Sequence, residues 1–439
     1  MALPLPAAGA LLTRRQLAVL RRPSLLAAAT VLLVCVPTGE KDVSAAVHVT
    51  AADLASLALV ALLAVDLLRG RRLGLSGPAA LLFGAVTVAA AAATVTSIDP
   101  STSLTGFVRL VQIFVLVPAA VLAALRDRTD LRLVLGAFVL AALIEGAVGA
   151  LQYLTKTGAS YTGEPIRAVG TFGALDVMAM SGVVSFGLLA ALALGLAEPP
   201  GSWARRGGLA AAAFLAFPLA VSFSRGSWIA TAVGVTALLV KADLRRALRW
   251  AGIGAAAVLV AVGGLGLGGA AVTERLDSIG SVSGGNEDHS VSDRYDLWTT
   301  ARAIWADHPV TGAGPKSFQQ LRDSHAPLRL SSGSDAADST IGFTREPLLS
   351  PHNMYFLVLS EQGLVGAVAY LGFFLALLIG AARRPGSAGP AALGLLCWVL
   401  VDFLYADIGG TTTVLTSVIL GVATWWALPA REPAAGEPQ

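Results

Sequence analysis

The chain has 439 residues, of which 55% are hydrophobic and 13% charged, and its formal net charge is +3 at pH 7. Soluble proteins average about 25% charged residues, and the mean hydropathy here is +0.71, so the composition excludes an ordinary soluble domain. The small basic excess lies beside apolar runs and gives no support for nucleic-acid binding. Cys35 and Cys397 also lie in apolar runs, which excludes a disulfide framework of the secreted type.

Lysine and arginine residues fall into clusters separated by long apolar runs, and every second gap is almost bare of them. Positive charge in short loops stays on the cytoplasmic side of a membrane. The alternation therefore predicts a polytopic membrane protein with both termini in the cytoplasm. The clusters are Arg14, Arg15, Arg21 and Arg22; Arg69, Arg71 and Arg72; Arg126, Arg128 and Arg132; Arg205 and Arg206; Lys241, Arg245, Arg246 and Arg249; Arg383 and Arg384; and Arg431.

Because a membrane-spanning helix needs about 20 apolar residues, the apolar runs predict about twelve spans. An open sheet cannot satisfy its backbone hydrogen bonds in lipid, so we expect helices and an all-α fold class. A signal peptide is the alternative interpretation of the first run, which follows four arginines. The runs lie near residues 24–37, 51–68, 78–98, 104–125, 131–154, 171–197, 208–223, 227–240, 250–271, 352–380, 391–408 and 412–428.

The seventh and eighth spans are unusually short. Residues 207–240 must hold two crossings and a turn, which leaves about 16 residues, or roughly 24 Å, for each crossing. The hydrocarbon core is about 30 Å thick, so we expect the turn at residues 222–226 to lie below the outer surface. A re-entrant hairpin is the alternative, and it would invert the orientation of all that follows.

The topology divides the chain into four regions. Residues 1–271 hold nine spans, residues 272–351 form a large extracytoplasmic loop, residues 352–428 hold three more spans, and residues 429–439 form a cytoplasmic tail. A loop of this length is more often functional than idle. Within it, residues 292–305 predict an amphipathic helix, ended by Pro309, Gly312 and Gly314, because apolar side chains recur at helical spacing. These side chains are Leu297, Trp298, Ala301, Ile304 and Trp305.

Ionisable residues inside spans are costly and usually functional. Most of those in this chain lie in the outer halves of their spans, which indicates a polar cavity that opens outward. For each of them a structural ion pair between helices is the alternative. The outer residues are Arg109, Glu145, Asp176, Asp402 and Asp407, and the exception is Asp66, near the cytoplasmic end of the second span.

Four more groups are expected on the outer side near this cavity: Arg167, Arg225, Arg294 and His352. Guanidinium groups match phosphate oxygens bidentately, so the arginines predict a site for a lipid phosphate or pyrophosphate. His352 opens the tenth span, and its ordinary pKa of about 6.5 suits a general base; capping of the helix is the alternative. The other histidines form no ligand-spaced set, so we expect neither a metal nor a cofactor.

Four segments in this order resemble the O-antigen ligase and polymerase superfamily of bacterial inner-membrane proteins. They are residues 167–172 (RAVGTF), 222–228 (SFSRGSW), 293–298 (DRYDLW) with 308–314 (HPVTGAG), and 351–355 (PHNMY) with 361–366 (EQGLVG). One departure is that the family often shows Pro-Asn after the first segment, where this chain has Ala174, Leu175 and Asp176.

The resemblance implies metal-independent glycosyl transfer on the outer face of the cytoplasmic membrane. The donor would be a glycan on undecaprenyl pyrophosphate, and the acceptor a hydroxyl of a glycan or lipid. His352 would activate that hydroxyl, and Arg225 and Arg294 would hold the pyrophosphate, with Arg167 and Arg109 as further candidates.

A ligase is therefore the leading hypothesis. A polymerase that joins lipid-linked repeat units needs the same donor site and stays open. The rival from another class is a transporter or flippase for lipid-linked glycan, which would tolerate loss of His352. Twelve spans suit a transporter, but the two halves of the chain show no repeat.

Overall fold

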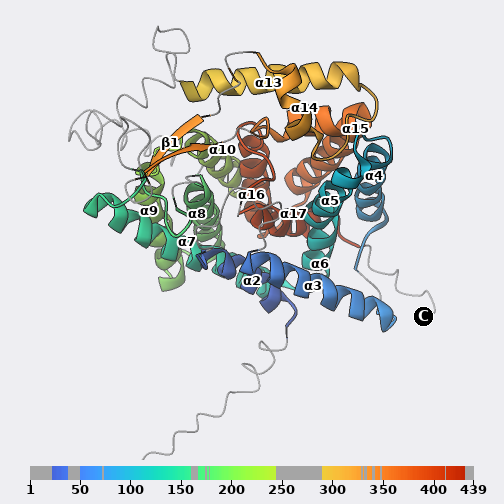
Figure 1. The fold of residues 1–439 in the computed structure, drawn as a ribbon. Coiled ribbons are helices and arrows are strands. Elements are labelled where there is room, and N and C mark those ends of the chain that lie inside the picture. Colours follow the sequence, from blue (N-terminus) through green and yellow to red (C-terminus); the bar gives the residue numbers. More distant parts are fainter. Residues whose placement is uncertain are drawn as a thin grey trace, which may run out of the picture.

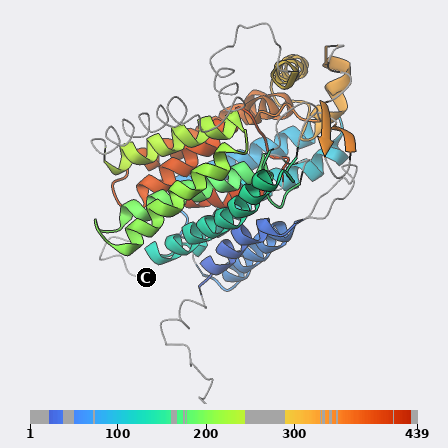
Figure 2. The same cartoon turned by 90° about the vertical axis from the view of Figure 1, so that its left-hand side faces the viewer.

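The structure is a computed structural model that describes residues 22–37, 50–71, 74–159, 167–173, 176, 178–243, 289–327, 330, 334–338, 342–346, 349–410 and 412–430. Within these ranges the chain forms a helical bundle, and one further helix, α13 (His289–Asp307), lies across one end of it (Figures 1 and 2). The predicted all-α class is confirmed.

Helices occupy every predicted apolar run that the structure describes, whereas the run at 250–271 lies outside the described residues. The bounds are α2 Ser24–Leu32, η1 Leu33–Cys35, α3 Ala51–Leu68, α4 Gly77–Val95, α5 Pro100–Val111, η2 Gln112–Leu116, α6 Val117–Ala124, α7 Arg128–Thr155, α8 Ala179–Ala197, α9 Trp203–Ala220, α10 Arg225–Ala242, α14 Ser317–His325, α15 Met354–Arg383, α16 Gly389–Asp402 and α17 Thr413–Ala427.

Six helical stretches in the described ranges are long and apolar enough to cross a membrane: α3, α4, α5 continued through η2 and α6, α7, α8 and α15. Three shorter apolar helices accompany them, formed by α2 with η1, by α16 and by α17. The structure therefore describes a multi-pass membrane protein, while the number twelve stays a prediction. The division at residues 271, 351 and 428 also stays a prediction, and residues 272–288 and 431–439 lie outside the described ranges.

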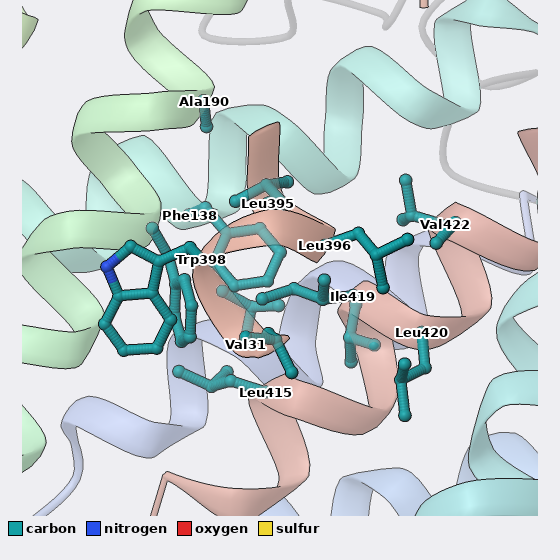
Figure 3. Packing of buried hydrophobic residues seen from close by; sticks show 14 of the residues in the cluster. Val31, Phe138, Ala190, Leu395, Leu396, Trp398, Leu415, Ile419, Leu420 and Val422 are labelled. Atoms are coloured by element: carbon teal, nitrogen blue, oxygen red, sulfur yellow. The ribbon is translucent and has the colours of Figure 1, made fainter. Parts of the chain in front are cut away.

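The core of the bundle lies among α2, α7, α8, α16 and α17. Figure 3 shows Phe138 and Trp398 among the aliphatic side chains of this core. Phe186 joins the two rings, with centroids 5.9 Å from Phe138 and 4.4 Å from Trp398. Small residues allow close helix packing in lipid: a Cβ at Gly234 of α10 would lie 2.9 Å from the carbonyl oxygen of Gly394 of α16.

The predicted turn between the seventh and eighth spans is present at residues 221–224. The flanking helices, α9 and α10, have 18 residues each, which is longer than the expected 16. The reason is that α9 begins at Trp203, where Ser202 caps it by accepting a hydrogen bond from Arg205 N. In contrast, α8 begins later than expected, at Ala179, because residues 167–173 form a turn with positive φ at Gly170 and Gly173.

The predicted helix at 292–305 is confirmed as α13, and a strap follows it, residues 309–316, which fills a break in α15. The break lies at Gly363, whose φ of 60° and ψ of −157° are open essentially only to glycine. The amides of Ala313 and Gly314 donate to the carbonyls of Ser360 and Glu361, at 3.0 and 2.9 Å. Beyond the break the donors lie on α15 and the acceptors on the strap. Leu364 N donates to Pro309 O (3.0 Å), and Val365 N donates to Val310 O (3.1 Å).

The strap also joins α14 and the connection between α4 and α5. Ile98 N donates to Ala313 O at 3.1 Å, and Ser103 Oγ donates to Pro315 O at 2.9 Å. The buried carboxylate of Glu361 accepts a hydrogen bond from Phe318 N at 3.2 Å, at the start of α14. The first amides of a helix have no partner within the helix, so this hydrogen bond fixes α14 to α15.

One antiparallel hairpin lies between α14 and α15, with β1 (Ser334–Asp338) and β2 (Gly342–Glu346) paired from Ser334 opposite Glu346 to Asp338 opposite Gly342. The sequence analysis predicted neither this hairpin nor α14. Figures 1 and 2 show the hairpin at the end of the bundle that α13 crosses.

Candidate active site

Segments that are far apart in the sequence meet at the end of the bundle crossed by α13 (Figure 1). The loop after α16 holds the start of α15, because Met354 N donates to Phe403 O at 2.9 Å and to Ala406 O at 3.1 Å. The start of α10 lies against the same loop, since a Cβ at Gly226 would be 3.5 Å from the Tyr405 side chain. This end therefore gathers α10, α13, α15 and the loop after α16.

His352 lies directly before α15 in a left-handed conformation, with φ of 46°. The side chain that caps α15 is that of Asn353, which accepts from Tyr355 N at 3.0 Å and from Phe356 N at 3.1 Å. The alternative that His352 caps this helix is therefore wrong. Asn353 also donates to Leu404 O at 3.1 Å, so this cap fixes the half-buried His352 beside the loop after α16.

Two opposite charges act on the His352 imidazole, those of Asp407 and Arg294. Burial lowers the pKa of His352 below its ordinary value of 6.5, the negative charge of Asp407 raises it, and the positive charge of Arg294 lowers it, with a net downward result. The lowered pKa favours the neutral form of the imidazole. It can therefore accept a proton from a hydroxyl group held against it.

Two acidic side chains lie at the end of α16 and in the loop after it. Arg294 interacts electrostatically with Asp402, the last residue of α16. The Oδ2 atom of Asp407 is buried and has no hydrogen-bond partner among the described residues. Unpaired buried acceptors are costly, so this atom marks a place for a hydrogen-bond donor such as a substrate hydroxyl.

The structure brings the segments of Arg167 and Arg225 together. Arg225 is the first residue of α10, and Ser224 caps that helix by accepting from Ser227 N at 3.3 Å. The turn before it binds the Arg167 segment, since Ala168 N donates to Val221 O at 3.2 Å. Both arginines thus belong to one pair of neighbouring turns.

Two residues of α7 clamp the Arg167 segment, and the sequence analysis assigned a role to neither. The buried carboxylate of Glu145 accepts from Thr171 N (2.9 Å) and Thr171 Oγ1 (2.8 Å). Gln152 donates to Gly170 O at 2.8 Å and accepts from Gly170 N at 2.9 Å. These residues are seven positions apart and so lie on one face of the helix, a spacing that could have indicated a shared partner.

Asp176 belongs to the segment that departs from the family pattern, and it lies against the loop after α16. A Cβ at Gly410 would be 3.5 Å from Asp176 Oδ2. This carboxylate therefore belongs to the same end of the bundle as Tyr405 and Asp407. Ala174 and Leu175, the other residues of that departure, lie outside the described residues.

Arg109 has a different environment. Its guanidinium donates to Asp53 Oδ1 at 2.6 Å and to Gln112 Oε1 at 3.2 Å. Asp53 is buried and forms a capping box with Thr50 at the start of α3. These contacts match the ion-pair alternative for Arg109, because they join α3 to α5 and involve neither His352 nor Arg294.

Among the described residues, no group of three histidine, cysteine, aspartate or glutamate side chains is close enough to hold a metal ion. The polar residues at this end of the bundle are instead a histidine, arginines and carboxylates. Together with the apolar helices, they form a charged cluster at one end of a multi-pass membrane protein.

Residues 210–371 match the O-antigen ligase family. This range contains three of the four motif segments, together with Arg225, Arg294 and His352. The match supports the resemblance to the O-antigen ligase and polymerase superfamily over these residues. The family indicates a bacterial membrane enzyme for glycan transfer of the ligase or polymerase type. No curated protein matches the chain.

Proposed function

We propose that this protein is a glycan ligase of the bacterial inner membrane. It transfers a glycan from undecaprenyl pyrophosphate to an acceptor hydroxyl on the outer face of that membrane, with both chain termini in the cytoplasm. The observation that carries the proposal is the His352 imidazole, on which the opposite charges of Arg294 and Asp407 act, at the end of the bundle where α10 starts with Arg225.

In the proposed step, His352 takes the proton of the acceptor hydroxyl. The oxygen then forms a bond to the anomeric carbon of the donor sugar, and the bond from that carbon to the pyrophosphate oxygen breaks. The electron pair leaves with the pyrophosphate. A general base held within hydrogen-bond reach of the hydroxyl contributes about 10²–10⁴-fold in rate.

Arg294 and Arg225 have the chemistry to hold the leaving group. Negative charge grows on the pyrophosphate as the bond to the sugar breaks, and guanidinium groups aimed at that charge stabilise the transition state. Arg167 lies on the turn beside Arg225 and is a further candidate. We assign Arg109 to a structural ion pair, because its contacts are to α3 and α5.

Asp402 and Asp407 are proposed to act on the acceptor side. Their charges oppose that of Arg294, and the buried Oδ2 of Asp407 can accept a hydrogen bond from a sugar hydroxyl. The site then has a cationic side for the pyrophosphate and an acidic side for the acceptor. His352 lies between them, where the proton is removed.

The test is the size profile of carrier-linked glycan in a deletion strain complemented with wild-type or His352→Ala protein. His325→Ala is the matched control. His325 lies in the same external region, at the end of α14, but its Nε2 hydrogen-bonds to Asp307 at 3.0 Å. Extracted protein is quantified to show that all variants insert.

We expect His352→Ala to leave full-length chains on the carrier, and wild type and His325→Ala to clear them. Single repeat units on the carrier would instead identify a polymerase with the same catalytic histidine. A normal profile with inserted His352→Ala protein would refute the general base, and the transporter would become the better hypothesis.

A further inference from the structure

Helix α13 carries Arg294 and must hold it at a fixed place over His352. Its inner face is held by a small core with α14 and the strap, in which Leu297, Ala301 and Ile304 are fully buried. This core lies on the C-terminal side of Arg294. A direct contact between α13 and the segment that carries His352 would fix the helix relative to the histidine.

Trp298 makes that contact. It lies four residues after Arg294, on the same face of α13. Its Nε1 donates to the carbonyl oxygen of Pro351 at 3.1 Å, and its ring stacks on Phe356 with centroids 5.6 Å apart and planes at 21°. Pro351 directly precedes His352, and Phe356 lies in the first turn of α15.

We infer that Trp298 is a positioning residue that fixes the separation between the Arg294 guanidinium and the His352 imidazole. The indole N–H hydrogen-bonds to Pro351, before the histidine, and the ring stacks on Phe356, after it. Trp298 itself lies in the helical turn that follows Arg294. A rotation or shift of α13 would change the separation of the two charges, and their interaction varies inversely with distance. The inference rests on the proposed role of His352 as a general base.

The charged groups around His352 determine the sign of the expected effect. Arg294 faces it from α13 and Asp407 from the loop after α16, while Asp402, at the end of α16, faces Arg294. Arg294 lowers the pKa of His352. If α13 moves away, that influence weakens while Asp407 stays in place, so the pKa of His352 rises.

The test is Trp298→Phe, which keeps an aromatic ring for Phe356 but removes the N–H. The matched control is Trp305→Phe on the same helix. Trp305 Nε1 donates to Pro309 O at 3.1 Å, so the control loses the same kind of bond two turns further from Arg294. Two quantities are measured: the pH dependence of kcat/KM, and the pH dependence of carbethoxylation of the His352 peptide by diethylpyrocarbonate, followed by mass spectrometry.

We expect Trp298→Phe to move the acid limb of the rate profile and the carbethoxylation midpoint together to higher pH, by about half a unit. Trp305→Phe should move neither. If Trp298→Phe fails to insert, Phe356→Leu replaces it, since it removes the stacking partner and keeps the indole N–H; a smaller shift in the same direction is expected.

A wild-type carbethoxylation midpoint in Trp298→Phe, with or without loss of activity, would overturn the inference. Equal shifts in both tryptophan variants would also overturn it, because the effect would then not be specific to the contact beside His352. Carbethoxylation needs no turnover, so it tests Trp298 even if His352→Ala proves active. An active His352→Ala variant would refute the proposed general base but would not decide the role of Trp298.

Discussion

Replacement of Gly363 by alanine should be among the most destabilising single changes in α15. Gly363 has a backbone conformation that is essentially restricted to glycine, and a Cβ there would lie 2.5 Å from the amide nitrogen of Gly312 in the strap. The strap is held by backbone bonds on both sides and cannot move aside without losing some of them. Both the backbone angles and the close approach therefore oppose the methyl group.

The cost can be estimated from these two effects. A non-glycine residue in this region of φ and ψ costs about 1–3 kcal/mol. Displacing the strap breaks the bonds from Ala313 to Ser360 and from Gly314 to Glu361, at about 1 kcal/mol each. We expect Gly363→Ala to lower the free energy of unfolding by about 3–5 kcal/mol.

Gly372→Ala is the matched control on the same helix. Gly372 is exposed and has open space where a Cβ would be. Within a helix, alanine is more stable than glycine by about 0.5–1 kcal/mol. Denaturant unfolding in detergent micelles would compare both variants with wild type. Equal stability of the two alanine variants would show that the strap does not depend on the break in α15.

Removing one charge at a time beside His352 should shift the pH–rate profile in opposite directions. Arg294→Gln removes a charge that lowers the pKa of His352, so the acid limb should move to higher pH. Asp407→Asn removes a charge that raises this pKa, so the acid limb should move to lower pH. Shifts of the same sign would contradict this electrostatic account. Arg109→Ala and Asp53→Ala should each destabilise the protein by about 1–3 kcal/mol, with little further loss in the double variant. A raised donor KM for Arg109→Ala at unchanged stability would instead place Arg109 in the donor site.

Much of the helical framework could be predicted because apolar length and charge alternation are local properties. The run at 51–68 coincides with α3, and residues 292–305 lie within α13. Boundaries were less accurate where a turn uses apolar residues, as at Gly170 and Gly173 before α8. Hydropathy alone cannot distinguish such a turn from the first turn of a helix.

The site was predictable to the extent that single residues reveal chemistry. His352 and Arg294 were chosen for their side chains, and the structure places them within electrostatic reach of each other. Their environment was not predictable, since Asp407 and Arg294 are more than a hundred residues apart. Capping was the alternative for His352 because it opens the span, although the next residue, Asn353, is a preferred helix cap.

The interlock of the strap with α15 was also beyond sequence reasoning. Gly312 and Gly363 each have a positive φ, but this conformation follows from a contact between segments that the sequence does not pair. Glu361 is a similar case. An acidic residue in an apolar run suggests a functional carboxylate, whereas here it accepts a backbone hydrogen bond at the start of α14.

The order of segments along the chain has a consequence for biosynthesis. Because a chain emerges from its N-terminus, the strap is translated before the helix whose break it fills. The carboxylates of Asp402 and Asp407 come later still, after α15 is complete. An unfinished chain therefore carries the arginines and the histidine without the acidic groups that face them. Under the proposed function, catalysis waits for α16 and the loop after it, so a nascent chain that ends before this loop is inactive.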